Sequence, residues 1–239
     1  MQIFQMALWL YGTALTRSFH CLRKNWVVSL APVVYGIGLT VVGTIVAPLG
    51  LIGGMLMSVA CLACASSALF MIKNLLDSGK ANVNDFLNGF TVYIWELITI
   101  RFILWIPMRV AEMGLGSASN GALLYFLFEL ALYTILNVIP ELIYQSRTSG
   151  LELIGASYHF IVENWLEWLV PNIIFGVAGF YLLDIFESYL FALPVFMQLF
   201  IYALVLGVAL TYFMTFRAFL FAGLHGTTRR SRLYRYNTR

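Results

Sequence analysis

Four charged side chains lie within or close to long apolar stretches, where a charge is costly and often marks a functional site. They are Glu96, Arg101, Arg109 and Glu129. Arg101 lies near the middle of one apolar stretch and Glu129 lies in the next. The short connection between the two stretches predicts antiparallel neighbours, so we expect Arg101 or Arg109 to form a buried ion pair with Glu129.

An intramembrane ion pair of this kind has two interpretations. It could be the proton or anion site of a transporter, or it could lock the register of two helices and dock the span of another subunit. A proton-coupled carrier needs a connected polar path, and the other apolar stretches contain few polar residues. Arg217, in the last stretch, is expected to extend to the cytoplasmic surface. The sequence therefore favours the structural or docking interpretation.

Two histidines, His20 and His159, occur at matching positions of two similar segments. Such a pair could bind a metal ion or haem. No carboxylate or second histidine stands at ligand spacing beside either residue, so the pattern favours interfacial aromatic side chains over ligands. We therefore predict no metal and no cofactor.

Glu163 and Glu167 are one helical turn apart, a spacing that could serve acid–base chemistry on lipid headgroups. They flank Trp165 at an expected membrane interface, which favours a solvated surface facing the basic carboxyl-terminal tail. His225, just before Gly226, is interpreted as the end of a helix.

The sequence lacks the local motifs of common enzymes. Cys61 and Cys64 form a CxxC pair, but they lie inside an apolar run, where small residues pack helix against helix. We find no nucleotide-binding loop, nucleophile elbow, zinc-protease motif or haem-attachment motif. The sequence thus favours a non-catalytic protein.

The composition predicts a membrane protein. Hydrophobic residues make up 61% of the 239 positions and charged residues only 10%, against roughly 25% charged in soluble domains. Mean hydropathy is +0.86. A soluble chain of this length could not bury so much apolar surface. We expect an all-α polytopic membrane protein with a single membrane domain.

Six apolar stretches approach the roughly 20 residues that a helix needs to cross a bilayer. They are residues 26–48, 51–72, 90–110, 121–143, 160–183 and 191–224. Residues 2–16 are too short to span and are predicted to form an interfacial helix. The expected organisation is an amino-terminal segment (1–24), a six-helix bundle of pseudo-repeated hairpins (25–224) and a basic tail (225–239).

The basic residues lie at the chain ends and in alternate connections. They are Arg17, Arg23, Lys24, Lys73, Lys80, Arg147, Arg229, Arg230, Arg232, Arg235 and Arg239. The intervening connections, 48–50, 111–120 and 184–190, contain no Lys or Arg. By the positive-inside rule both termini are cytoplasmic. The tail arginines are expected to contact anionic lipid rather than nucleic acid.

An internal repeat relates residues 18–32 to residues 157–171. The identities include His20 with His159, Asn25 with Asn164 and Trp26 with Trp165. Trp prefers the interface and Asn can cap a helix that enters lipid, so the repeat has a structural explanation. A weaker third copy is predicted near Asp85. Parallel repeats of this kind consist of a leading segment, a span, an outer turn and a return span.

The segment 78–90, next to these repeated apolar hairpins, resembles a bacterial superfamily of six-span membrane domains. That superfamily includes the membrane domain of glycerophosphoryl diester phosphodiesterases. The resemblance implies a multi-pass protein of the bacterial cytoplasmic membrane. The chain has no room for the soluble phosphodiesterase domain, so that activity is not implied.

Three functions follow from these patterns. The one we favour is an accessory or scaffold subunit of a larger membrane complex, with other membrane proteins as partners. The alternative is a small transporter or lipid-handling permease that uses Arg101 and Glu129. A membrane enzyme acting on headgroups through Glu163, Glu167 and His159 has the least support.

Overall fold

A computed structural model describes residues 2–116, 120–146, 148–191 and 193–238, and each regular element in these ranges is a helix. This confirms the all-α prediction. Arg147 and Arg239, two of the basic residues used to assign topology, and residues 117–119 of one connection lie outside the described residues. The helices are α1 (Gln2–Lys24), η1 (Trp26–Leu30), α2 (Ala31–Val46), η2 (Ala47–Leu49), α3 (Leu51–Ser78), α4 (Val83–Val92), α5 (Ile94–Leu115), α6 (Gly121–Ile135), α7 (Ile139–Gln145), α8 (Leu151–Leu190), α9 (Val195–Leu224) and α10 (Arg229–Asn237).

Within the described ranges, five helical stretches are long and apolar enough to cross a bilayer. A sixth span results if α4 and α5, which are bent by 43° at their junction, are counted together. The chain is therefore an α-helical membrane protein. The third span is the least apolar because α5 contains Glu96, Arg101 and Arg109.

The helix ends differ from the predicted stretches at four places. The third stretch is interrupted at Tyr93, where α4 ends and α5 begins, and the fourth is interrupted between α6 and α7. The fifth belongs to a longer helix that starts at Leu151, and the sixth starts after Pro194. Hydropathy could not locate the breaks at Tyr93 and between α6 and α7, because apolar residues continue across both.

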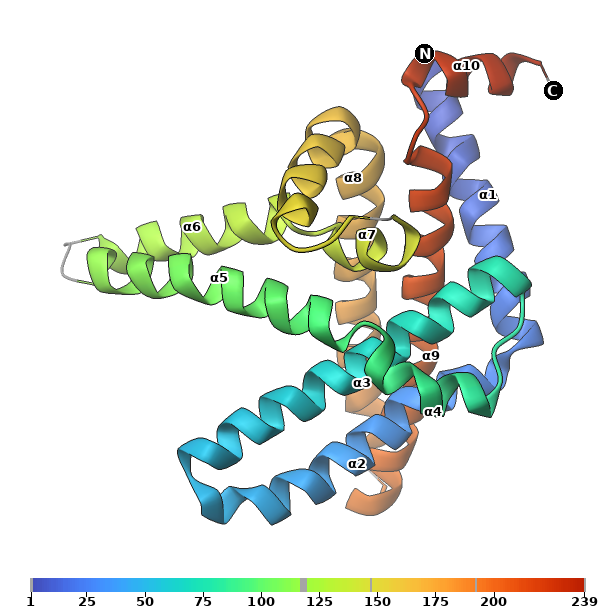
Figure 1. Cartoon of the computed structure of the whole chain (residues 1–239). Coiled ribbons are helices and arrows are strands. Elements are labelled where there is room, and N and C mark those ends of the chain that lie inside the picture. Colours follow the sequence, from blue (N-terminus) through green and yellow to red (C-terminus); the bar gives the residue numbers. More distant parts are fainter. Residues whose placement is uncertain (1, 117–119, 147, 192, 239) are drawn as a thin grey trace.

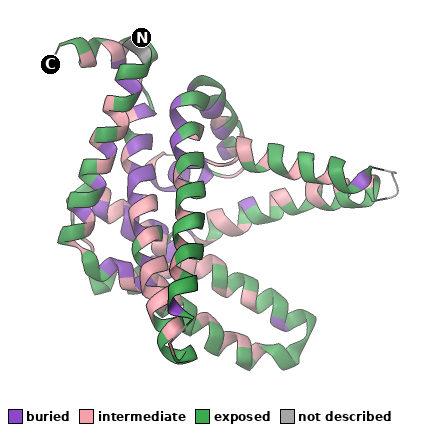
Figure 2. Ribbon diagram, turned by 180° about the vertical axis from the view of Figure 1, so that it is seen from behind, coloured by how far each residue is buried: buried purple, intermediate pink, exposed green. Residues whose placement is uncertain are grey.

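Three helical hairpins diverge from a common region, as Figure 1 shows: α2–α3, α5–α6 and α8–α9. The other helices pack around the roots of these hairpins. Most buried residues lie in this region, whereas the outer parts of the hairpins are largely exposed (Figure 2). The exposed side chains there are mainly large and apolar, such as Ile45, Met113 and Phe196. Lipid or another protein must cover these surfaces.

Helix α1 packs along the carboxyl-terminal half of α9 in an antiparallel direction (Figure 1). Its buried residues Ala14, Ser18 and Cys21 face the core. The Tyr11 hydroxyl donates to the carbonyl of Leu166 at 3.4 Å, which links α1 to α8. The amino-terminal helix predicted at residues 2–16 thus continues to Lys24 and belongs to the packed core; its position relative to the bilayer stays a prediction.

The chain makes the same backbone break at the start of each hairpin. Asn25 has φ −125° and ψ 40°, Tyr93 has φ −116° and ψ 11°, and Asn164 has φ −124° and ψ 19° inside α8. At both asparagines the side-chain amide donates to the carbonyl four residues earlier, Cys21 or Phe160. The two segments that the repeat aligns therefore share one local geometry.

A serine hydroxyl from α3 enters the break at Tyr93. Ser66 Oγ accepts a hydrogen bond from the Tyr93 backbone N–H at 2.8 Å and donates to the Gly89 carbonyl at 2.6 Å. These two backbone groups would bond to each other in an unbroken helix. The approach is close, because a Cβ built on Gly89 would lie 2.8 Å from Ser67 Cα. Ser66 thus satisfies both groups that the bend releases.

Replacing Ser66 with alanine should therefore destabilise the protein. Ser66 is fully buried, and the substitution leaves the N–H of Tyr93 and the carbonyl of Gly89 without their partner, at a cost of about 1–3 kcal/mol. Ser58→Ala is the matched control, because exposed Ser58 lies on the same helix and bonds only within it. Thermal unfolding in detergent should show a clearly lower midpoint for Ser66→Ala alone. Equal midpoints for the two variants would contradict the assigned role.

Candidate functional site

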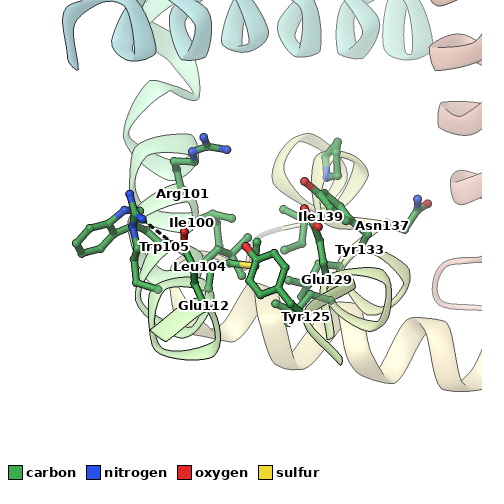
Figure 3. Close-up of a pocket in the computed structure, with 15 residues that line it drawn as sticks. Ile100, Arg101, Leu104, Trp105, Glu112, Tyr125, Glu129, Tyr133, Asn137 and Ile139 are labelled. Carbon is green, nitrogen blue, oxygen red and sulfur yellow. Dashed lines mark hydrogen bonds and ion pairs between the residues drawn. The ribbon is translucent and has the colours of Figure 1, made fainter. Parts of the chain in front are cut away.

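A cavity of about 710 Å³ lies between α5 and α6, with residues at the start of α7 at its inner end (Figure 3). Its wall is mainly apolar and aromatic, with Leu104 and Trp105 on α5 and Leu132 and Tyr133 on α6. Its polar lining residues are Arg101, Arg109, Glu112, Tyr125, Glu129 and Asn137. The predicted charged positions are thus brought to one cavity, except for Glu96, which is half-buried near the start of α5 and is not among the lining residues.

The expected ion pair with Glu129 does not form. Arg109 Nη1 instead bonds Glu112 Oε2 at 2.7 Å, one turn along its own helix, and both side chains are 56% exposed. The Arg109 guanidinium also lies 5.9 Å from the centroid of the Trp105 ring. Arg101 and Glu129 take part in none of the three ion pairs found among the described residues. Arg109 thus pairs with Glu112, the nearer acid on its own helix, and Glu129 has no ion-pair partner among the described residues.

The inner end of the cavity adjoins a buried ion pair that joins α7 to α9. Arg217 Nε bonds Glu141 Oε1 and Arg217 Nη2 bonds Glu141 Oε2, each at 2.7 Å. The Glu141 side chain is fully buried and that of Arg217 is 8% exposed. The expectation that Arg217 extends to the cytoplasmic surface is therefore wrong, because its Nε and Nη2 atoms bond the Glu141 carboxylate inside the core.

Aromatic rings and an asparagine complete the surroundings of this pair. The Arg217 guanidinium lies 5.1 Å from the centroid of the Trp168 ring and 5.6 Å from that of Phe213. Arg217 Nη2 also donates to the Asn137 carbonyl at 2.6 Å, and Trp168 Nε1 donates to Asn137 Oδ1 at 3.0 Å. Asn137 lines the cavity as well. One residue thus connects the cavity wall to the ion pair.

The carboxyl-terminal tail folds back on α8. Arg229 Nε and Nη2 bond the two carboxylate oxygens of Glu167 at 2.7 and 2.9 Å, and Glu167 is fully buried. This contact raises the pKa of Arg229, chiefly through the side-chain hydrogen bond. Glu167 does face the basic tail, as expected, but the predicted solvated surface holds only for the exposed Glu163, because α10 covers the Glu167 carboxylate.

Arg232 is also held inside the protein rather than displayed on the surface. Its Nη2 donates to Asn164 Oδ1 at 2.8 Å, at the break in α8, and burial lowers its pKa. Ring contact between Trp9 and Tyr236, with centroids 6.1 Å apart, adds a link from α10 to α1. Arg230 and Arg235 are exposed. Of the four tail arginines predicted to contact lipid, two therefore have protein partners.

The remaining predicted residues stand at separate places. His159 is exposed on α8 beside Tyr158, and Trp26 and Trp165 are 63% and 53% exposed. His20 lines a second recess on α1. Glu163 is exposed. No group of three or more His, Cys, Asp or Glu side chains within the described ranges is arranged to hold a metal ion.

Sequence reasoning missed Glu141 and its partnership with Arg217. Glu141 follows Pro140 in the first turn of a short helix, near the end of an apolar stretch. An acid at such a position is easily interpreted as a residue at the membrane interface. The sequence did contain a signal for this pair: an acid near the end of one apolar stretch and an arginine within another. The pairing itself depends on a contact across 76 residues of sequence.

Glu141→Gln should strongly destabilise the fold. It leaves Arg217 as a buried charge without its counter-ion, which typically costs about 3–5 kcal/mol. Glu129→Gln is the matched control: it makes the same change on the neighbouring helix, at a residue with no ion pair in the described structure. Detergent unfolding midpoints should fall for Glu141→Gln and stay near wild type for Glu129→Gln. A comparable loss for Glu129→Gln would contradict the assignment of Glu141 as the acid that holds the core.

Comparison with known proteins found no counterpart: no protein-family model matches the chain, and neither curated proteins nor solved structures gave a match.

Proposed function

We propose that the chain is a non-catalytic membrane subunit that assembles with another membrane protein through the α5–α6 hairpin. The observation that carries the proposal is the isolation of Arg101 and Glu129. Both line the cavity, and neither has an ion-pair partner among the described residues. By contrast, two acids at the roots of the hairpins, Glu141 and Glu167, are fully buried and bound by arginines.

The energy of charges in lipid supports this reading. A charged residue at the centre of a span costs roughly 2.5–3.5 kcal/mol on insertion scales, so such residues usually face a partner or a water-filled cavity. Arg101 is exposed and Glu129 half-buried. A span from a second protein that carries an acid opposite Arg101 or a donor opposite Glu129 would satisfy both side chains.

The exposed outer surface of the hairpin gives such a partner access. On α5, Phe102, Trp105 and Val110 are each more than half exposed, and on α6 the same holds for Leu123 and Phe126. The hairpin contacts the remainder of the protein near its root, and its outer part stands apart in Figure 1. Helix association in lipid depends on packing and polar contacts, and this face offers both.

A lipid-handling permease is the second candidate, and the cavity itself favours it. Its volume of about 710 Å³ lies within the roughly 300–1,000 Å³ of small-molecule sites. The wall is apolar, with charges from Arg101 and Glu129 at two positions. An amphipathic molecule could place its headgroup on these charges and its chains against Leu104 and Leu132.

Affinity purification from native membranes distinguishes the two candidates. The double variant Arg101→Gln/Glu129→Gln should lose a stoichiometric protein partner, identified by mass spectrometry, if the hairpin docks a subunit. The control is Arg109→Gln/Glu112→Gln, which removes an exposed pair at the same cavity. If the double variant loses bound phospholipid instead, the permease reading holds. Unchanged partners and lipids in the double variant would defeat both.

We also propose that the chain resides in a bacterial cytoplasmic membrane, as the resemblance of segment 78–90 implies, with both termini inside, as the distribution of basic residues indicates. Reporter fusions test this topology. Fusions after residues 115 and 187 should report the side opposite to a fusion after residue 238. If the fusions after residues 115 and 238 report the same side of the membrane, the assigned direction of the third span is wrong and the proposed topology fails.

A further inference from the structure

A recess of about 430 Å³ lies between α1 and the end of α3, apart from the α5–α6 cavity. Three basic residues of α1 line it: Arg17, His20 and Lys24. They are three and four residues apart and therefore share one helix face. Leu75 and Leu76 of α3 and Phe219 of α9 form its apolar side.

These side chains have no anion of their own. None of the three ion pairs in the described residues involves Arg17, His20 or Lys24. No Asp or Glu is among the residues that line the recess. Like charges on one helix face repel, so an external anion would stabilise this arrangement.

The carbonyl end of α3 does not supply the missing acceptors. Helix carboxyl ends attract cations because their last carbonyls lack partners. Here the Leu75 carbonyl accepts the Gly79 N–H at 3.1 Å and lies 3.9 Å from the Cys21 thiol, which donates to it. The Gly79 carbonyl accepts the Asn25 side-chain amide at 2.9 Å. Uncharged groups of Cys21 and Asn25 thus occupy these two carbonyls.

The recess lies where the end of α1 meets the carboxyl end of α3, a helix long and apolar enough to cross a bilayer. The bond from Asn25 to Gly79 joins the last residue before η1 to the carboxyl end of α3. Phe19, between Arg17 and His20 in sequence, and Trp26, two residues after Lys24, are 61% and 63% exposed. Exposed aromatic residues beside spans occupy the headgroup level of a bilayer. Cations at this depth face lipid phosphates.

We propose that this recess is a phosphate-binding site that takes the headgroup of an anionic phospholipid. Arg17 and Lys24 bind the phosphate oxygens, the His20 ring adds a hydrogen bond, and the apolar side formed by Leu76 and Phe219 contacts the first carbons of the lipid. A phosphate free in solution presents the same chemistry, so the experiment separates the two sources. This site is independent of the partner site on α5–α6.

The test measures lipid binding to the purified full chain by native mass spectrometry in detergent. Phosphatidylglycerol and phosphatidylcholine are titrated separately. The variant Arg17→Gln/Lys24→Gln should bind phosphatidylglycerol at least about tenfold more weakly, since it loses two charge-assisted hydrogen bonds. The control Arg23→Gln/Lys80→Gln removes two exposed basic residues that do not line the recess. It should bind within about twofold of wild type, because lost surface charge alone has a small effect.

Three further arms fix the interpretation. His20→Glu, a single change at an exposed position, places an anion in the recess and should weaken binding even if the double variant folds poorly. The variant Arg17→Lys/Lys24→Arg keeps both charges and should bind phosphatidylglycerol about as well as wild type. Inorganic phosphate should compete weakly if the lipid is the ligand; tight phosphate binding without phosphatidylglycerol binding would assign the site to a soluble phosphate. Equal losses in the recess variant and the control variant would overturn the proposal, as would equal affinity for phosphatidylcholine.

Discussion

Inside a bilayer every backbone polar group needs a partner within the protein, and the three breaks at Asn25, Tyr93 and Asn164 meet this requirement in different ways. The asparagines turn their own amides onto the carbonyl four residues earlier, whereas the break at Tyr93 depends on a hydroxyl from another helix. Each solution also fastens a second element: Asn25 holds the end of α3, Ser66 holds α4, and Asn164 holds α10 through Arg232. The helices that lead into the hairpins are therefore joined to the core at the points where they bend.

The buried charges follow the same plan. Arg217 with Glu141 ties α9 to α7, and Arg229 with Glu167 ties α10 to α8. Both pairs are bidentate and lie near the roots of the hairpins, where most of the buried residues gather (Figure 2). Arg217 and Glu141 are both buried, whereas in the second pair only Glu167 is buried and the Arg229 side chain is 46% exposed. A buried charge gains little net stability from its pair, but the loss of its partner is costly, so these pairs fix which elements meet. The outer parts of the hairpins contain no such pair among the residues described.

The sequence predicts what depends on composition and local pattern. Apolar length predicts the helical membrane architecture, and the repeat of Asn25–Trp26 at Asn164–Trp165 marks two of the three breaks. The third break is at a tyrosine and is determined by Ser66, 27 residues earlier, so the weak copy near Asp85 could not locate it. Arg101 and Glu129 were correctly assigned to neighbouring helices that share a cavity, but their pairing required distances that sequence does not contain. The tail looked like a lipid anchor because Glu167 and Asn164, its partners, are more than 60 residues away.

The separation of paired from unpaired charge is the strongest guide to function. The chain neutralises Glu141 and Glu167 with its own arginines. In contrast, two sets of charged residues have no counter-ion in the described structure: Arg101 and Glu129 on the α5–α6 hairpin, and Arg17 and Lys24 on α1. The two unpaired sets differ in depth and in sign. The α1 set is cationic, lies beside exposed aromatics and suits a phosphate, whereas the hairpin set contains both signs within an apolar cavity. A ligand for the second set must itself carry polar groups of both kinds in lipid, and a partner helix meets that requirement more readily than a simple ion.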